Sequence, residues 1–150
     1  MDCIFCKIVE GKELAHKIWE DAEHMAFLSI FPNTKGFSVV ITKEHYPSHY
    51  SDMSEEVFAG LFLATRKVAK ILDKKFEDVS KTGIIMEGFG VDHAHTKLFP
   101  MHGTSGSWKK RISKLKDSSQ YFKKYEGYIS SHDYKRANDE ELKKLAKELT

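Results

Sequence analysis

One long segment with a helical period constrains the fold of this chain more than any other part of its sequence. Over residues 55–76 apolar side chains recur at helical spacing, and Ser54 stands where a side chain can cap the helix. Segments rich in β-branched and aromatic residues, typical of strands, lie before and after it, at 16–19, 25–31, 37–43, 82–88 and 92–101. Strands on both sides of one helix predict an α+β domain with an antiparallel sheet.

The N-terminal segment is less regular. Residues 4–9 and 16–19 are short and apolar, and Gly11 lies between them. Apolar runs of this length separated by a glycine indicate a hairpin or loosely paired strands. We therefore expect residues 4–9 to form a strand.

The composition changes after Pro100, and residues 102–119 are rich in Gly, Ser and Lys, which predicts a surface loop. A short helix is expected over 138–149, because Asn138 can cap it and its leucines form an apolar stripe. We expect one domain over residues 1–104, followed by a C-terminal extension over 105–150. The extension would pack on the same domain or on a partner subunit.

The composition also argues against several classes of protein. Of the 150 residues 41% are hydrophobic, and 24 basic against 22 acidic residues give a net charge of +2. So small a charge predicts no strong general attraction to nucleic acid. No apolar run approaches the roughly 20 residues of a membrane helix, and the first residues lack the pattern of a secretory signal. We expect a cytoplasmic protein that does not bind a membrane.

The last predicted strand carries an unusual set of polar residues. Alternate side chains of a strand share a face, so His93, His95 and Lys97 are expected to point the same way. Burying two imidazoles and an ammonium without partners is costly, but the three groups would fit around a phosphate. A neutral imidazole can attack phosphorus, and a neighbouring cation can stabilise the phosphoryl oxygens. Gly88 and Gly90, just before the strand, would let a ligand approach the backbone closely.

Two other interpretations of these histidines stay open at this point. Histidines one residue apart can simply line the exposed face of a sheet. They can also be metal ligands, because a His-x-His pair on a strand has suitable geometry.

Cys3 and Cys6 are the only cysteines, and their spacing is that of a metal-ligand pair. In a reducing compartment such a pair favours a metal or redox site over a structural disulfide. Two imidazoles would complete a tetrahedral zinc site, and the candidates are His45, His49 and His93. The alternative is a pair of free thiols, while a redox role lacks the βαβ context of thioredoxin-like motifs.

Four segments, in the same order along the chain, resemble the histidine triad (HIT) family. The family signature alternates histidines with apolar residues, and the strand that contains His95 is similar to it. The others resemble the start of the family sequence and its second and third strands. The four segments, which together cover about residues 3–101, are GVDHAHTKLFP at 90–100, CIFCKIV at 3–9, FLSIFP at 27–32 and GFSVVITKEH at 36–45.

The resemblance implies a HIT-like α+β fold, usually a homodimer whose strands continue across the interface. It implies a nucleotide-binding domain over residues 1–104 and a hydrolase or nucleotidyl transferase that acts at the α-phosphate. His95 would be the nucleophile that forms a nucleotidyl-histidine, with His93 helping to orient it and Lys97 beside it. Substrates would be dinucleoside polyphosphates or nucleoside phosphoramidates. The alternative is a nucleotide-binding regulatory protein with little turnover.

The resemblance also assigns binding residues. A structural zinc ion would be held by Cys3, Cys6, His45 and His93, with His49 as the substitute for His45. The nucleotide would be bound by residues of the N-terminal strands and of the glycine-containing segment before the histidines. These residues are Ile4, Phe5, Ile8, Phe27, Ser29, Ile30, Glu87, Gly88 and Gly90.

The sequence departs from the family pattern at three of these positions. Lys97 replaces the third histidine, and an ammonium is a poor proton shuttle at neutral pH. Ser29 replaces an aspartate that binds the ribose hydroxyls, and it accepts fewer hydrogen bonds. Glu87 lies near a position where relatives often have an asparagine, and its carboxylate could repel phosphate or point away. These departures concern substrate choice and rate more than the fold.

Overall fold

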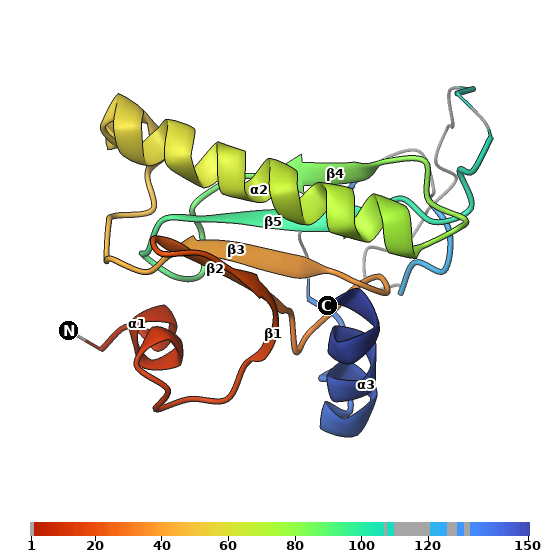
Figure 1. Cartoon of the computed structure of the whole chain (residues 1–150), viewed down its shortest axis with the longest axis horizontal. Coiled ribbons are helices and arrows are strands. Elements are labelled where there is room, and N and C mark those ends of the chain that lie inside the picture. Colours follow the sequence, from red (N-terminus) through yellow and green to blue (C-terminus); the bar gives the residue numbers. More distant parts are fainter. Residues whose placement is uncertain (1, 107, 110–120, 126–128, 131–132) are drawn as a thin grey trace.

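The computed structural model describes all residues except 1, 107, 110–120, 126–128 and 131–132. It is an α+β fold in which a five-stranded antiparallel sheet has the order β1-β2-β3-β5-β4. The long helix α2 lies along one face of the sheet, and α1 and α3 lie well apart from each other on the β1–β2 side (Figure 1). The elements are α1 (Ile4–Val9), β1 (His16–Glu20), β2 (His24–Leu28), β3 (Ser38–Thr42), the short 3-10 helix η1 (Tyr50–Asp52), α2 (Glu55–Lys75), β4 (Thr82–Ile85), β5 (His95–Pro100) and α3 (Asp139–Leu149).

Helix α2 confirms the prediction from its period. The Ser54 hydroxyl accepts a hydrogen bond from the Val57 amide at 3.3 Å, which caps the first turn. Leu61, Val68 and Leu72 are fully buried against the sheet. The helix thus forms the main core of the domain with β3 and β5, and it fixes one face of β5 as an apolar surface.

Strand β5 shows the alternation that the sequence predicted. Leu98 lies in the core beneath α2, and the Thr96 hydroxyl is hydrogen-bonded to that of Thr65 at 2.7 Å on the same face. Phe99 lies in the cluster on the opposite face, where its ring packs 4.4 Å from that of Phe37. Strand β5 is an interior strand, between β3 and β4, and it holds His95, its first residue, by pairing with β3, whereas His93 lies just before the strand.

The strand expected at residues 4–9 is wrong, because this segment is helix α1. A run of six residues that is apolar at every position but Lys7 fits a buried strand and about one and a half helical turns equally well, so its periodicity cannot decide. The helical form buries Phe5 against the sheet and places Cys3 and Cys6, three residues apart, on one side of the helix. Gly11, with φ +71°, ends the segment.

Helix α3 is capped as expected, because the Asn138 side chain accepts hydrogen bonds from the Glu140 and Glu141 amides at 2.9 and 3.2 Å. Leu142 and Leu149 are buried in the same core as α2. The described end of the extension therefore packs on the main domain, while the boundary at residue 104 stays a prediction. Most of the loop expected at 102–119 lies outside the described residues. Within the described part of the chain, no helix is long and apolar enough to cross a membrane.

Candidate active site and metal site

His95 opens strand β5 and lies opposite Ile41 of β3. Its Nδ1–H donates to the carbonyl oxygen of His93 at 2.6 Å, which leaves the Nε2 lone pair free. Burial lowers the pKa of His95, and the positive charge of Lys97 acts in the same direction. The imidazole is therefore neutral near pH 7, the state in which it can act as a nucleophile.

An apolar wall lies beside this imidazole. The Phe5 ring of α1 stands edge-on to the His95 ring at 5.4 Å and to the Phe27 ring at 5.7 Å. Ile8 packs against the same cluster, whereas Ile4 is largely exposed. Three of the predicted binding residues are thus brought together next to His95, and helix α1 supplies two of them.

Lys97 does not offer a free ammonium at the site. It forms an ion pair with Oε1 of Glu87, and the side chains are 17% and 26% exposed. The other carboxylate oxygen of Glu87, Oε2, is shielded from solvent and accepts no hydrogen bond from the residues that the structure describes. The sequence left open whether the Glu87 carboxylate would repel a bound phosphate or point away from it. In the structure the carboxylate is turned to Lys97 and offsets its charge.

The glycines before β5 have a local role. Gly88 and Gly90 have φ of +73° and +93°, which favour glycine. A Cβ on Gly88 would lie 3.0 Å from the Ser48 carbonyl oxygen. In this structure it is therefore Ser48 that lies close to the backbone of Gly88, where the sequence predicted the approach of a ligand. The Ser48 hydroxyl donates to the Gly88 carbonyl at 2.8 Å, and its amide donates to the Asp92 carboxylate at 2.8 Å. Sequence reasoning missed Ser48 and Asp92, although Asp92 directly precedes His93.

The two remaining predicted nucleotide contacts lie away from the apolar wall. Ile30 packs against the core formed by α2 and α3. The Ser29 hydroxyl accepts a hydrogen bond from the Phe31 amide at 3.1 Å. Ser29 also lines a cavity of about 730 Å³ between the β2–β3 loop, the extension and α3.

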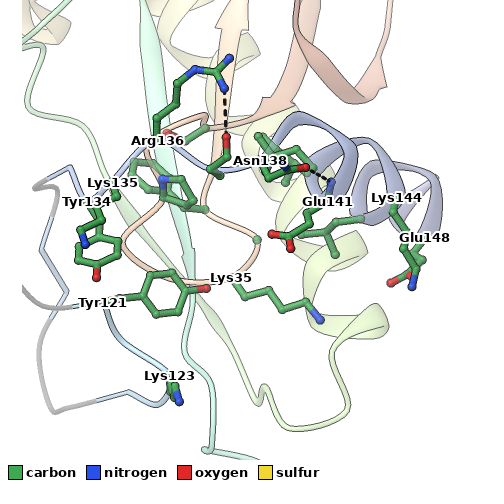
Figure 2. A pocket seen from close by; sticks show the side chains of 18 residues that line it. Lys35, Tyr121, Lys123, Tyr134, Lys135, Arg136, Asn138, Glu141, Lys144 and Glu148 are labelled. Atoms are coloured by element: carbon green, nitrogen blue, oxygen red, sulfur yellow. Dashed lines mark hydrogen bonds between the residues drawn. The ribbon is translucent and has the colours of Figure 1, made fainter.

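This cavity was not predicted, because its residues come from segments far apart in the sequence (Figure 2). Its walls carry more basic than acidic groups, and they include two tyrosines whose rings lie 5.6 Å apart. His95 is not among the residues that line it. The charged and aromatic residues of the walls are Lys35, Lys123, Lys135, Arg136, Lys144, Glu141, Glu148, Phe37, Tyr121 and Tyr134.

The proposed zinc ligands lie together. One donor atom each from Cys3, Cys6, His45 and His93 forms a group whose members all lie within 4.8 Å of one another. Cys3 Sγ is 3.4 Å from His93 Nδ1, and Cys6 Sγ is 3.4 Å from His45 Nδ1. Ligands about 2.0–2.3 Å from a tetrahedral centre are roughly 3.3–3.8 Å apart, so this set of atoms fits a metal ion.

The hydrogen bonds around the cluster support this fit. Nε2–H of His93 donates to the Thr42 carbonyl oxygen at 2.8 Å, which leaves Nδ1 unprotonated toward the two sulfur atoms. His49 lies outside the cluster, exposed and hydrogen-bonded to Asp52. The geometry therefore favours His45 over His49, and these four residues could hold a metal ion.

Comparison with known proteins identifies the family and agrees with the fold. Residues 10–104, more than half of the chain, match the model of the HIT domain. The chain belongs to the HIT family. An adenosine 5'-monophosphoramidase of Schizosaccharomyces pombe is 38% identical over 101 residues, which cover 67% of this chain and 74% of that relative.

Solved HIT structures show the same architecture. A Hit-like protein of Bartonella henselae superposes with a TM-score of 0.72 at 20% identity, and the superposition covers 99% of this chain and 93% of the Bartonella chain. A zinc-bound histidine triad family protein of Mycobacterium smegmatis gives a TM-score of 0.68 at 21% identity, covering 99% and 91%. At these identities the likeness concerns the fold, which is therefore HIT-like.

Proposed function

We propose that this HIT protein is a nucleotide hydrolase or nucleotidyl transferase that acts at the α-phosphate through His95. The observation that carries the proposal is the state of that side chain, buried, neutral and tied through Nδ1 to the His93 carbonyl. Its Nε2 lone pair is available for attack on phosphorus. The similarity to a relative named adenosine 5'-monophosphoramidase supports this class of reaction.

In this proposal Nε2 of His95 attacks the α-phosphorus, and the bond from phosphorus to the leaving group breaks. The base packs against Phe5, Phe27 and Ile8. The leaving group is an amine or the polyphosphate of a dinucleotide. Water or a second acceptor then takes the nucleotidyl group from His95. The test is the release of mononucleotide from a nucleoside phosphoramidate and from a dinucleoside tetraphosphate.

A regulatory nucleotide-binding protein with little turnover is the second candidate. The observation that favours it is the Lys97–Glu87 ion pair, which offsets the one cation placed two residues beyond His95. Saturable nucleotide binding without release of product from either substrate class would support it.

We also propose that the cluster of Cys3, Cys6, His45 and His93 holds a structural zinc ion. When bound, zinc would tie α1 to the end of β5 and would not contact the phosphate. A cytoplasmic location, where thiols stay reduced, agrees with this role and stays a prediction.

We expect a homodimer. Strand β4 is an edge of the sheet, with β5 as its one strand neighbour among the described residues, and its Ile84 is 41% exposed. Light scattering at micromolar concentration should give twice the chain mass of 17.3 kDa. Ile84→Lys should shift the protein toward the monomer, and Leu14→Lys, at an exposed residue outside the strands, should not. A wild-type protein that stays monomeric would contradict the prediction.

Lys97 is expected to influence the choice of leaving group. An ammonium near the phosphates stabilises a leaving group that departs as an anion, whereas an amine needs a proton. Lys97→Ala should slow hydrolysis of a dinucleoside tetraphosphate about tenfold, and hydrolysis of a phosphoramidate less. We expect no larger loss for the tetraphosphate, because Glu87 already offsets part of the charge of Lys97.

Lys97→His restores the third histidine and should shift the preference toward phosphoramidates. Steady-state kinetics of Lys97→Ala and Lys97→His on both substrates measure this preference, as the ratio of the two kcat/KM values. Equal effects on the two classes would reject the leaving-group argument.

A further inference from the structure

Glu87 is the charged group near His95 whose role the proposed reaction does not explain. Ile85, the last residue of β4, pairs with Lys97 of β5. Side chains two residues apart share a face, so Glu87 follows Ile85 on the side of the sheet that carries Lys97 and His95. Continuing the antiparallel register past the end of β4 brings Glu87 to the region opposite His95. Burial lowers the pKa of His95, and the negative charge of Glu87 partly opposes that effect.

One oxygen of the Glu87 carboxylate is engaged and the other is not. Lys97 holds Oε1, while Oε2 is shielded from solvent and has no donor among the described residues. Buried polar atoms of native proteins are nearly always hydrogen-bonded, so Oε2 is expected to receive a donor other than the described residues, and a molecule bound beside His95 would supply one. An ionised phosphate carries only acceptors, and a carboxylate repels it. The partner must therefore be an O–H or N–H group.

The other side chains at the site are poor candidates for accepting a proton. Both nitrogens of His93 are engaged, Nδ1 toward the cysteine sulfurs and Nε2–H by the Thr42 carbonyl. His95 carries the nucleotidyl group in the intermediate, and the Lys97 ammonium has no lone pair. Oε2 of Glu87 is the acceptor that remains among the described groups around His95.

We propose that Glu87 is the general base that activates water for hydrolysis of the nucleotidyl-His95 intermediate. This inference rests on the proposed function. The water oxygen bonds to phosphorus, the bond from phosphorus to Nε2 breaks, and its electron pair returns to the imidazole. The proton of the water passes to Oε2 and then to solvent. Lys97 holds the carboxylate through Oε1 and offsets its charge, which lets an anionic nucleotide bind beside it.

The test separates the two halves of the reaction. A nucleoside 5'-phosphoramidate is mixed with excess protein, and release of the amine gives the rate at which the intermediate forms. Mass spectrometry of the intact protein follows the loss of the nucleotidyl group, which gives the rate of its breakdown. Glu87→Gln keeps the shape but not the basicity of the side chain. It should leave formation within about threefold of wild type and slow breakdown about 100-fold, so that the nucleotidyl protein accumulates.

Two further measurements distinguish a base from a group that only positions Lys97. Lys97→Met frees the carboxylate and removes the cation, and it should slow breakdown less than tenfold. Breakdown in the wild type should be slower in deuterium oxide, and Glu87→Gln should reduce that isotope effect, because the proton transfer is removed. Equal slowing of breakdown by the two variants would assign Glu87 to positioning and overturn the proposal.

The remaining outcomes are equally decisive. If Glu87→Gln slows only formation of the nucleotidyl intermediate, Oε2 serves the amine of the leaving group and the proposal is overturned. If the variant leaves breakdown of the intermediate unchanged, Glu87 is not the general base. Formation measured in the same variant reports that it is folded. If His95→Ala retains turnover, the proposed function itself fails. If that variant is inactive and Glu87→Gln behaves as wild type, only the inference about Glu87 fails.

Discussion

Replacing His95 with alanine or asparagine is expected to abolish nucleotide turnover, by roughly 10⁴-fold or more, while nucleotide binding stays largely intact. The reason is that Nε2 of this residue is the atom proposed to bond to phosphorus, whereas the apolar wall of Phe5 and Phe27 that would hold the base is unchanged. Product release measures the first effect and titration calorimetry with a mononucleotide measures the second.

The matched control is His49→Ala, because His49 is an exposed histidine outside the site. It should keep wild-type kinetics. Full activity of His95→Ala would refute the mechanism. Loss of binding along with turnover would mean that His95 shapes the pocket as well as reacting in it.

The second large effect concerns zinc. Protein purified without added zinc should contain one zinc ion per chain, and Cys6→Ser or His45→Ala should lose it, because each removes a ligand from the four-donor cluster. At a free zinc concentration about 1,000 times the Kd, binding stabilises the fold by about 4 kcal/mol. The ligand variants should therefore unfold roughly 10 °C below wild type.

Metal analysis and thermal unfolding with and without a chelator check this prediction. His49→Ala should retain its zinc, since His49 lies outside the cluster. Metal-free wild-type protein with both thiols freely titratable under reducing conditions would contradict it. The role of His95 would stand in that case, because zinc is not proposed to contact phosphorus.

Sequence reasoning found the parts of the fold that local signals specify. The period and cap of α2, and the alternation of β5, follow from spacing alone. The first helix was missed because a six-residue, mostly apolar run does not distinguish a strand from a helix, and the helical form is selected by where Phe5 can be buried.

The candidate site was predicted to a similar degree. The cysteine and histidine spacings pointed to the cluster but left His45 and His49 open; the family resemblance chose His45, and the structure places His45 in the cluster. The Glu87–Lys97 ion pair depends on the register between β4 and β5, which no local pattern in the sequence contains. The cavity at Ser29 depends on where the extension packs, and the sequence gives no sign of that.

The two faces of β5 limit how this protein can change in length. Insertion or deletion of one residue between His95 and Leu98 would bring the two side chains to the same face, so that either His95 would turn toward α2 or Leu98 would leave the core beneath it, since side chains alternate with a period of two. The segment from Gly88 to Gly90 lies outside the strands, and the hydrogen bond from Ser48 holds it at the Gly88 carbonyl, so its length is freer to vary. Natural divergence and deliberate redesign of leaving-group preference should therefore accumulate in this short connection, while the strand keeps its number of residues.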